Sequence, residues 1–488
     1  MIAILGAGPA GLTAAYELTR QGEACVVLEQ GSQVGGLSRT VNHQGYLFDI
    51  GGHRFYTAVP SIEQIWRETL GEDLVTRPRL SRIYYRQRFF HYPLEPWNVI
   101  AGLGPVEVVR CGLSYLAAQF RRRGGERSFA EWVTNRFGRR LFEIFFRTYT
   151  EKVWGIPCTE IGADWAAQRI RGLSFGTLVR QTLLEGRMPV RSLIREFLYP
   201  RRGPGMMWER MRERVERAGA RVLTGHGVEG IEFKGGRVAA VRAGGTRFDV
   251  KGAISTIPLR DLLPMVDPAP PESVLQAAAS LRYRDFLTVA LMVRGRDLFP
   301  DNWIYIHEPD VKVGRIQNYT NWSPEMSPDP AMSCLGMEYF CFEGDGLWTS
   351  GDEELSALAR RELQKLGLVD VRLVEGSAVL RVPKAYPMYD RGYQRRREVL
   401  GAWFRGVPNL EAAGRNGLHR YDNQDHAMLS GILAARNLLG ASFDLFGWQQ
   451  EDYLEDAESA LAAEWARLEA MQPAVPVPSA RNAGRASG

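Results

Sequence analysis

The chain has 488 residues and a formal net charge of +5, and 45% of its residues are hydrophobic and 24% charged. This length exceeds what one hydrophobic core usually serves, and the composition is that of a globular protein, so we expect two or three domains. The mild basic excess suits an anionic small-molecule ligand, and we expect no nucleic-acid partner.

The five cysteines form no CxxC pair, which argues against a disulfide framework or a zinc site and predicts that no metal is bound. The first five residues lead directly into a glycine loop, without the basic segment and apolar run of a signal peptide. We therefore expect a cytoplasmic protein. Whether it forms a homo-oligomer is left open.

Residues 97–120 are the most apolar long segment, although Glu107 and Arg110 interrupt it. A membrane-spanning helix needs about 20 apolar residues without such charges. The favoured interpretation is a helix packed within a helical lobe, with no membrane association. The alternative is a helix lying in the membrane interface, with the basic run 121–123 beside it.

In chain order, the pattern predicts a strand over 2–5, a glycine loop, a helix over 12–20 and a strand over 25–28. A further strand and loop are expected near 45–52, and the stretch 62–184 reads as mostly helical. A helix over 206–217 precedes an alternating segment, 221–250, which predicts a small β-meander with its turn at Gly235-Gly236.

The second half begins with a strand over 252–257. Strands are then expected over 288–293, 303–307, 315–320 and 334–342. Together they predict a second, largely antiparallel sheet. Helices are expected over 353–366 and 430–439, and the Pro-, Ala-, Ser- and Gly-rich segment 472–488 predicts a disordered tail.

The N-terminal motif indicates a dinucleotide site. Gly6 permits a tight turn, Gly8 lets the backbone approach a pyrophosphate, and Gly11 allows close packing of helix on strand. The N-terminus of the following helix offers N–H groups and a positive dipole end to phosphates. Glu29, at the end of the next strand, is placed to accept hydrogen bonds from a ribose hydroxyl.

Residues 29–40, EQGSQVGGLSRT, resemble the extended motif of the FAD family that includes amine oxidases, protoporphyrinogen oxidases and phytoene desaturases. This resemblance implies FAD as the cofactor, Arg39 near the pyrophosphate and Val228 near the adenine. It also implies that the chain returns to the flavin over 414–426, with Gly414 at the start of that segment. No second glycine motif is present, so a reductant such as NAD(P)H would dock transiently.

These observations predict an α/β fold: a Rossmann-like FAD-binding domain with a helical lobe and an antiparallel β-sheet substrate domain. The predicted ranges are 1–80, 205–270 and 385–470 for the discontinuous FAD-binding domain, 81–204 for the lobe, 271–384 for the substrate sheet and 472–488 for the tail.

Several segments resemble the UDP-galactopyranose mutases more narrowly, particularly the eukaryotic type. They are residues 49–53 (DIGGH), 149–157 (YTEKVWGIP), 164–170 (DWAAQRI), 303–305 (WIY), 321–324 (NWSP) and 423–426 (NQDH). The resemblance implies catalytic roles for His53, Arg169 and Arg315. It also implies further contacts with the flavin by Gly51, Gly52, Asn423, Gln424 and Asp425, and with an anionic substrate by Tyr92, Arg169, Trp303, Tyr305, Arg315, Asn321 and Tyr421.

Two departures from the mutase pattern concern the sugar. Tyr92-Pro-Leu-Glu95 has a glutamate where the mutases have a sugar-binding glutamine, and the asparagines that follow in the mutases are missing. The segment from Arg420 to Asn423 is two residues shorter than its mutase counterpart.

Three functions are compatible with these patterns. The first is a sugar-nucleotide mutase, in which N5 of reduced FAD attacks the anomeric carbon and the sugar recloses between pyranose and furanose forms. The second is an FAD-dependent oxidoreductase related to amine oxidases or protoporphyrinogen oxidases, with O₂ or a quinone as acceptor. The third is a non-catalytic FAD-binding scaffold. The register of Trp303, Tyr305 and Arg315 favours the mutase.

Overall fold

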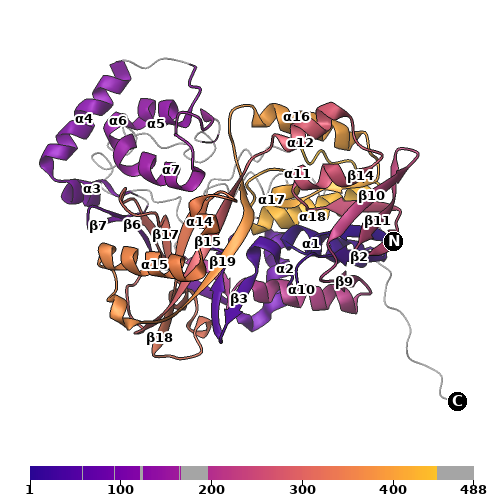
Figure 1. The fold of residues 1–488 in the computed structure, drawn as a ribbon, viewed down its shortest axis with the longest axis horizontal. Helices are drawn as coiled ribbons and strands as arrows, with labels where there is room; N and C mark the ends of the chain where they lie inside the picture. The colour runs from indigo at the N-terminus through magenta and orange to yellow at the C-terminus, as the bar shows by residue number, and fades with distance from the viewer. Residues whose placement is uncertain (58, 93, 121–124, 164, 166–195, 448–488) are drawn as a thin grey trace.

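The computed structural model describes residues 1–57, 59–92, 94–120, 125–163, 165 and 196–447. Its centre is a five-stranded parallel sheet in the order β20-β13-β1-β2-β9 (Figure 1). The strands are β1 (Ile2–Leu5), β2 (Cys25–Leu28), β9 (Arg221–Leu223), β13 (Gly252–Ser255) and β20 (Leu410–Ala412). Three separated parts of the sequence therefore build one sheet. Its inner strands are buried on both faces, as their short apolar runs predict.

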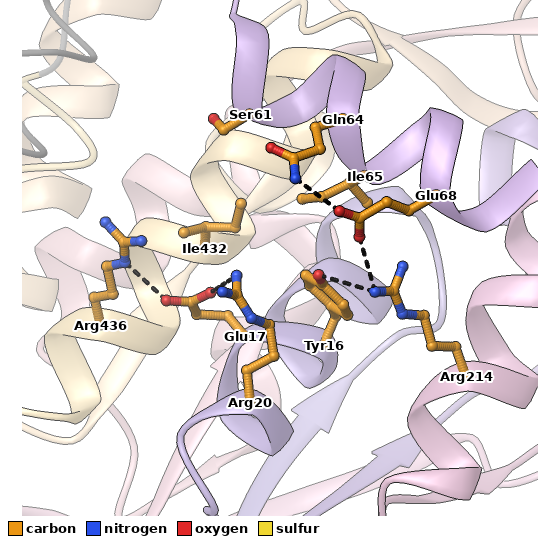
Figure 2. A pocket seen from close by; sticks show the side chains of 10 residues that line it. All are labelled: Tyr16, Glu17, Arg20, Ser61, Gln64, Ile65, Glu68, Arg214, Ile432 and Arg436. Atoms are coloured by element: carbon orange, nitrogen blue, oxygen red, sulfur yellow. Dashed lines mark hydrogen bonds and ion pairs between the residues drawn. The ribbon is translucent and has the colours of Figure 1, made fainter. Parts of the chain in front are cut away.

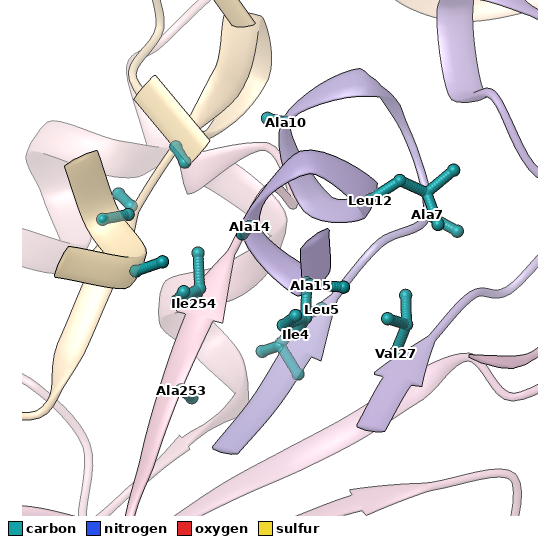
Figure 3. Close-up of a cluster of buried hydrophobic side chains, with 14 of the residues drawn as sticks. Ile4, Leu5, Ala7, Ala10, Leu12, Ala14, Ala15, Val27, Ala253 and Ile254 are labelled. Atoms are coloured by element: carbon teal, nitrogen blue, oxygen red, sulfur yellow. The ribbon is translucent and has the colours of Figure 1, made fainter. Parts of the chain in front are cut away.

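Three helices pack on this sheet: α1 (Pro9–Arg20), α10 (Gly205–Arg217) and α18 (Gln424–Leu438). Helix α2 (Pro60–Leu70) packs in turn on α10 and α18. Figure 3 shows Ala14 and Ala15 of α1 beside Ile4 and Ile254 of the strands, within one buried cluster. The helix predicted over 430–439 begins six residues earlier, at Gln424. Its whole N-terminal part is buried against α1, which local sequence signals do not reveal.

The predicted meander is confirmed as a small sheet in the order β12-β11-β10-β14, with the expected turn at Gly235-Gly236. The strands are β10 (Val228–Lys234), β11 (Arg237–Ala243), β12 (Thr246–Asp249) and β14 (Val266–Asp267). Helices α11 (Leu259–Leu262) and α12 (Glu272–Ala279) flank β14 in the sequence, and α16 (Tyr393–Arg405) packs on α12.

The second large sheet has seven strands in the order β19-β15-β18-β17-β16-β6-β7, and all its pairings except β16 with β6 are antiparallel. The strands are β6 (Ser81–Tyr85), β7 (Arg88–His91), β15 (Tyr283–Arg294), β16 (Trp303–Ile306), β17 (Arg315–Asn318), β18 (Met332–Cys341) and β19 (Val374–Pro387). Helix α15 (Asp352–Leu366) packs its apolar side chains into the core of this sheet. The predicted fold class is therefore confirmed.

The sheet contains strands that the sequence pattern did not predict. The hairpin of β6 and β7 lies inside the range read as helical, and its turn uses Arg86 and Gln87 at positive φ instead of the glycine or asparagine that marks such turns. The hairpin also falls in the range assigned to the lobe, yet it pairs with β16. Strand β19 contains Pro383, and Lys384 has a positive φ. Both features are unusual within a strand, so the sequence pattern did not predict β19.

Shorter elements position the loops between the two large sheets. They are β3 (Thr40–His43), β4 (Tyr46–Asp49), β5 (Leu74–Pro78), β8 (Glu196–Pro200), α13 (Tyr319–Trp322), α14 (Gly346–Thr349) and α17 (Gly414–Gly417). Strand β4 contacts β18 and α13, so the residues that follow β4 begin beside the seven-stranded sheet.

A lobe of helices stands at the end of the molecule opposite the five-stranded sheet (Figure 1). Its helices are α3 (Pro96–Leu103), α4 (Pro105–Phe120), α5 (Phe129–Phe137), α6 (Arg139–Leu141) and α7 (Thr148–Trp154), with a π-helical turn over Phe142–Arg147. Ser128 and Glu131 form a capping box at the start of α5.

Helices α3 and α4 belong to the predicted lobe, but the packing of α4 is one-sided. Within α4 only Glu107 and Cys111 are buried, because α5 and α6 cover just one side of the helix. In the described residues no single helix has the length and apolarity to cross a membrane, but Trp97–Leu103 and Pro105–Phe120 meet those criteria as a pair bent by 118°. The tail 472–488 lies outside the described residues.

Candidate functional site

The glycine loop between β1 and α1 has two positions that only glycine can fill. A Cβ on Gly6, whose φ is +106°, would lie 2.2 Å from Thr256 Oγ1, and a Cβ on Gly11 would lie 1.9 Å from the Gly6 carbonyl oxygen. Gly8 differs, because a Cβ there would meet only the Cα of Gly36, at 3.8 Å. The space above Gly8 is a cradle that a side chain would fill, which is the feature that close approach of a pyrophosphate requires.

Glu29 lies at the edge of this loop. Its carboxylate accepts hydrogen bonds from the backbone N–H groups of Ala7 and Gly31, both at 2.8 Å. A carboxylate can accept about four hydrogen bonds, so acceptor capacity remains for a ribose hydroxyl. The backbone of Glu29 also accepts the N–H of His226, two residues before Val228, so the predicted adenine-side residue lies next to the acid.

Arg39 lies on the other side of the loop, where its Nη1 donates to the Gly36 carbonyl at 3.2 Å. Burial lowers the pKa of Arg39, while the charge of Glu29 raises it, so the two predicted cofactor residues act on each other electrostatically.

The returning segment also reaches the glycine loop. Gly414 has φ of +76° and donates its N–H to Ser430 Oγ at 2.9 Å, and a Cβ there would lie 3.0 Å from the Ala10 Cβ. Asn423 precedes the first residue of α18, where Gln424 accepts a hydrogen bond from Trp208 Nε1 at 3.1 Å. The Gln424 Nε2 is buried without a hydrogen-bond partner, which leaves one donor for a ligand. Asp425 follows in the first turn.

The loop that contains Gly51, Gly52 and His53 lies against β17 and β18. A Cβ on Gly51 would be 3.6 Å from Arg315 Nη2, 3.7 Å from His53 Cε1 and 3.9 Å from Glu338 Oε1. A Cβ on Gly52 would be 2.8 Å from Gln317 Nε2. The two glycines therefore allow the substrate sheet to approach the flavin-side loop.

His53 is surrounded by positive charge. Burial, together with the charges of Arg415 and Arg315, lowers its pKa to about 3, and a backbone hydrogen bond with Gly51 opposes this shift. Its Nδ1 is buried without a hydrogen-bond partner. His53 is therefore uncharged at neutral pH and suits a hydrogen-bonding role better than proton transfer.

Arg315 is held by a buried carboxylate. It pairs in register with Glu338 of β18, donates its Nε–H to that carboxylate, and has a side chain that is 16% exposed. Gln317 donates to the other oxygen of Glu338 at 3.0 Å. Burial raises the pKa of Glu338, and the charge of Arg315 opposes this rise.

Aromatic side chains surround Arg315. The ring of Tyr305 lies 5.1 Å from that of Tyr92, 5.3 Å from that of Tyr149 and 6.3 Å from that of Trp303. Tyr386 and Tyr421 stack at 5.8 Å, and the guanidinium of Arg415 lies 4.7 Å from the Tyr421 ring centroid. We call these aromatic rings together with Arg315, Arg415, Gln317 and Glu338 the arginine–tyrosine cluster.

The cluster includes most of the predicted substrate residues: Tyr92, Trp303, Tyr305, Arg315 and Tyr421. Asn321 does not join it, because its amide donates to the carbonyls of Phe299 and Asp301, both at 2.8 Å, and thereby anchors a loop. Arg169 lies outside the described residues.

The sequence analysis did not select Arg415, Gln317 or Glu338 as site residues. Gln317 could have been found, because residues two apart on a strand share a face and Arg315 was already selected. Arg415 and Glu338 carry no local signal, since only the fold brings them to the cluster.

A separate cleft of about 590 Å³ opens between α1, α2, α10 and α18 (Figure 2). Glu17 in it pairs with Arg20 and Arg436, and Arg214 bonds Glu68 and the Tyr16 hydroxyl. These residues of α1 lie in its C-terminal half, whereas the glycine loop precedes its N-terminus, so the cleft is distinct from the nucleotide site.

Asp49 gives the folded chain a pH dependence. Its buried carboxylate accepts hydrogen bonds from Thr40 Oγ1 at 2.8 Å and from the Tyr199 hydroxyl at 2.5 Å. Burial outweighs these bonds and raises the pKa of Asp49 from 3.8 to about 7. Because folded Asp49 keeps a proton that the unfolded chain has lost, the free energy of unfolding falls as the pH rises from about 4 to about 7.

We expect Asp49→Asn to remove the part of this fall that Asp49 contributes, measured by urea unfolding at a series of pH values. Glu411 is a second, independent contributor, since burial also raises its pKa to about 7. The Glu411→Gln variant should remove a separate and additive part of the slope. An unchanged slope in Asp49→Asn would show that Asp49 is ionised throughout.

Comparisons with known proteins agree with the nucleotide site. The model of the family "Flavin containing amine oxidoreductase" matches residues 9–439. The flavin-containing monooxygenase FMO GS-OX-like 2 of Arabidopsis thaliana is 61% identical over 36 residues, and this match spans 7% of the chain and 8% of that relative.

Two solved structures share the fold. Reduced UDP-galactopyranose mutase superimposes with a TM-score of 0.80 at 23% identity, over 91% of this chain and 97% of the mutase. Wild-type putrescine oxidase bound to putrescine superimposes with a TM-score of 0.62 at 18% identity, over 90% of this chain and 99% of the oxidase. The glycine loop, the cradle above Gly8 and the family match agree: the chain belongs to the flavin-containing amine oxidoreductase family, and its cofactor is FAD.

Proposed function

We propose that this flavoenzyme is a sugar-nucleotide mutase that interconverts pyranose and furanose forms of a nucleoside-diphosphate hexose. The observation that carries the proposal is that two arginines lie in one aromatic cluster beside the flavin-side loop: a Cβ on Gly51 would be 3.6 Å from Arg315 Nη2, and the Arg415 guanidinium lies 4.7 Å from the Tyr421 ring centroid. A diphosphate needs such a pair, because guanidinium groups stay charged and bind phosphate oxygens through two N–H groups at once.

Both arginines are held in position before any ligand arrives. Glu338 fixes Arg315, while Arg415 donates to the backbone carbonyls of Asp422 and Ala385 at 2.7 to 3.0 Å. A guanidinium has five N–H donors, so each arginine can bind phosphate with those that its anchors do not use. Little side-chain entropy is then lost on binding.

The tyrosines of the cluster are suited to donate hydrogen bonds to phosphate oxygens. Burial raises the pKa of Tyr386 to about 12 and that of Tyr149 well above its usual value. Their hydroxyl groups therefore keep their protons at neutral pH. Hydrogen bonds to a charged acceptor contribute about 1.5–3 kcal/mol each.

Reduced FAD would supply N5 as the nucleophile toward the anomeric carbon. The chain's own residues would orient the sugar: Arg315 and Arg415 bind the departing diphosphate, and uncharged His53 holds the flavin-side loop without removing a proton. The reductant that activates the flavin is proposed to be NAD(P)H, docking transiently.

The second candidate is an oxidoreductase of the amine oxidase type with O₂ or a quinone as acceptor. The family match and the fold shared with putrescine oxidase favour it. A protonated amine, however, would enter a cluster with two arginines and one carboxylate, Glu338, which is already paired with Arg315. Repulsion therefore disfavours an amine, and a sugar alcohol or a saturated carbon is the better substrate for this alternative.

The test is an anaerobic assay of FAD-loaded protein with a panel of UDP- and dTDP-hexoses, with and without dithionite, resolved by HPLC. An isomerised sugar that forms only in the reduced sample would support the mutase and identify the hexose. No product in any sample, together with flavin absorbance that does not shift on adding the nucleotides, would contradict it.

Tyrosine hydroxyl groups give a finer prediction. We expect Tyr305→Phe and Tyr421→Phe each to weaken UDP binding by about 10- to 100-fold, because each removes a hydrogen bond to a phosphate oxygen. Flavin absorbance titration with UDP measures the effect. Tyr84→Phe is the control, since its buried hydroxyl already donates to the carbonyl of Leu366, the last residue of α15, and Tyr84 is not part of the arginine–tyrosine cluster. Equal affinities in all three variants would exclude tyrosine contacts with the diphosphate.

A further inference from the structure

We propose that α3 and α4 form a face that docks this enzyme on an anionic lipid bilayer. Of the twelve exposed large hydrophobic side chains in the described residues, seven lie on these two helices. The most exposed are Phe120 at 90%, Trp97 at 67% and Val106 at 66%. Contiguous apolar exposure of this kind marks an interaction site. We call it the α3–α4 face.

The spacing of the exposed side chains shows that they form one stripe. On α4 the stripe consists of residues three and four apart: Val106, Val109, Leu113, Leu116 and Phe120, which are 52–90% exposed. Residues at this spacing lie on one side of a helix. The opposite side carries buried Glu107 and Cys111 and packs against α5 and α6. The fold therefore buries the side of α4 that carries Glu107 and exposes the apolar side, which is available to a partner.

The charges around the face complement an anionic surface. Within the two helices Arg110 is the one exposed charged side chain, because Glu107 is buried and paired with Arg140. Arg86 and Arg88 are exposed beside the helices. Arg88 donates a hydrogen bond to the Gly102 carbonyl of α3. Arg86 is close to α4, because its charge lowers the pKa of Glu107, although less than Arg140 does.

The exposed carboxylate nearest in sequence, Glu95, precedes α3 and pairs with His91. Arginines that border an apolar helix are attracted to anionic headgroups.

The geometry of the two helices suits a flat surface. Gly104, with φ of +82°, ends α3, and the helices meet at a bend of 118°. Two helices that meet at a bend lie in one plane, so both can rest on a bilayer. In Figure 1 they occupy the outer end of the molecule, away from the five-stranded sheet. Trp97 and Phe120, near opposite ends of the pair, are side chains of the kind found on the apolar face of helices that lie in a membrane interface.

A second copy of the chain is the competing occupant. The stripe on α4 has the heptad spacing of a coiled coil but covers only two heptads, and three or more are usual. The positions that flank it are Arg110, Gly112, Ala117 and Gln119, and one arginine without a carboxylate at a matching position offers no charge pairs to select a partner helix. A lipid surface needs no such selection, so it fits the face better.

The experiment is flotation of the full-length, FAD-loaded protein with vesicles of phosphatidylglycerol and phosphatidylcholine, or of phosphatidylcholine alone. We expect binding to the anionic vesicles that weakens in high salt. The triple variant Val109→Ser, Leu113→Ser, Leu116→Ser should lower the partition coefficient by roughly 100-fold, since three large apolar side chains no longer enter the bilayer. Because all three side chains are exposed, the variant should keep its flavin absorbance and its thermal unfolding.

The control variant is Leu373→Ser with Leu439→Ser, which removes two exposed leucines elsewhere on the surface and should bind vesicles like the parent. The proposal is wrong if the parent does not float with anionic vesicles, or if the triple variant floats as well as the parent. A parent dimer that the triple variant dissociates, without vesicle binding, would assign the face to a second copy instead.

Discussion

An alanine at position 8 is expected to weaken FAD binding by about 10- to 100-fold while the protein stays folded. Gly8 has φ of −79°, which alanine adopts readily, and its added Cβ would meet only the Cα of Gly36 at 3.8 Å. The methyl group would instead occupy the cradle and hold the pyrophosphate away from the backbone N–H groups, each worth about 1.5–3 kcal/mol. Flavin retained after desalting, read by absorbance, measures the loss.

Two further glycines make this result interpretable. Gly11→Ala should destabilise the fold itself by more than about 3 kcal/mol, because its Cβ would overlap the Gly6 carbonyl oxygen at 1.9 Å. Gly112→Ala, in a helix and with no atom near its Cβ, should stabilise the protein by about 0.5–1 kcal/mol and leave FAD bound. If Gly8→Ala keeps its full complement of flavin, the pyrophosphate does not lie over Gly8.

The second large effect is expected at the buried ion pair of the arginine–tyrosine cluster. Arg315→Met should cost about 3–5 kcal/mol of stability, because it leaves the carboxylate of Glu338 buried without its counter-charge. It should also abolish UDP binding. Adding Glu338→Gln removes the buried charge, so the double variant should regain most of the stability but none of the binding. Urea unfolding and flavin titration with UDP measure the two properties separately.

A matched ion pair lies in the same sheet. Arg82 donates to buried Asp301 at 2.6 and 2.8 Å, outside the cluster. Arg82→Met should cost a similar amount of stability and leave UDP binding intact in the protein that remains folded. If Arg315→Met with Glu338→Gln still binds UDP at parental affinity, the diphosphate does not contact Arg315.

Local patterns in the sequence were sufficient for the nucleotide half of the site. Gly11 and Glu29 contact their own loop, and spacing was enough to select them together with Gly6, although the atom that a side chain on Gly6 would meet, Thr256 Oγ1, comes from a distant strand end. Gly52, which precedes His53, could be selected by resemblance. Only the tertiary structure shows why this residue is a glycine: Gln317 occupies the space that a side chain at position 52 would need.

The substrate half depended on contacts that no local pattern encodes. Asn321 matched a family motif, yet its amide is used to hold a loop. Glu338 meets Arg315 through strand pairing across 23 residues, and Arg415 arrives from the returning segment near the C-terminal end of the described chain. The sequence suggested single residues, and the fold decided which of them form the arginine–tyrosine cluster.

The sequence alone determined a dinucleotide site, because a glycine loop between a strand and a helix has a mechanism that needs mainly neighbouring residues. The resemblance of residues 29–40 to the FAD family and the order of the predicted elements added the cofactor and the α/β architecture. The tertiary structure decided that the hairpin of Ser81–Tyr85 and Arg88–His91 joins the substrate sheet, although its turn lacks glycine. It also decided that α4 turns Glu107 inward and its apolar stripe outward. Periodicity identifies two faces of a helix, but only the neighbouring helices determine which face is covered.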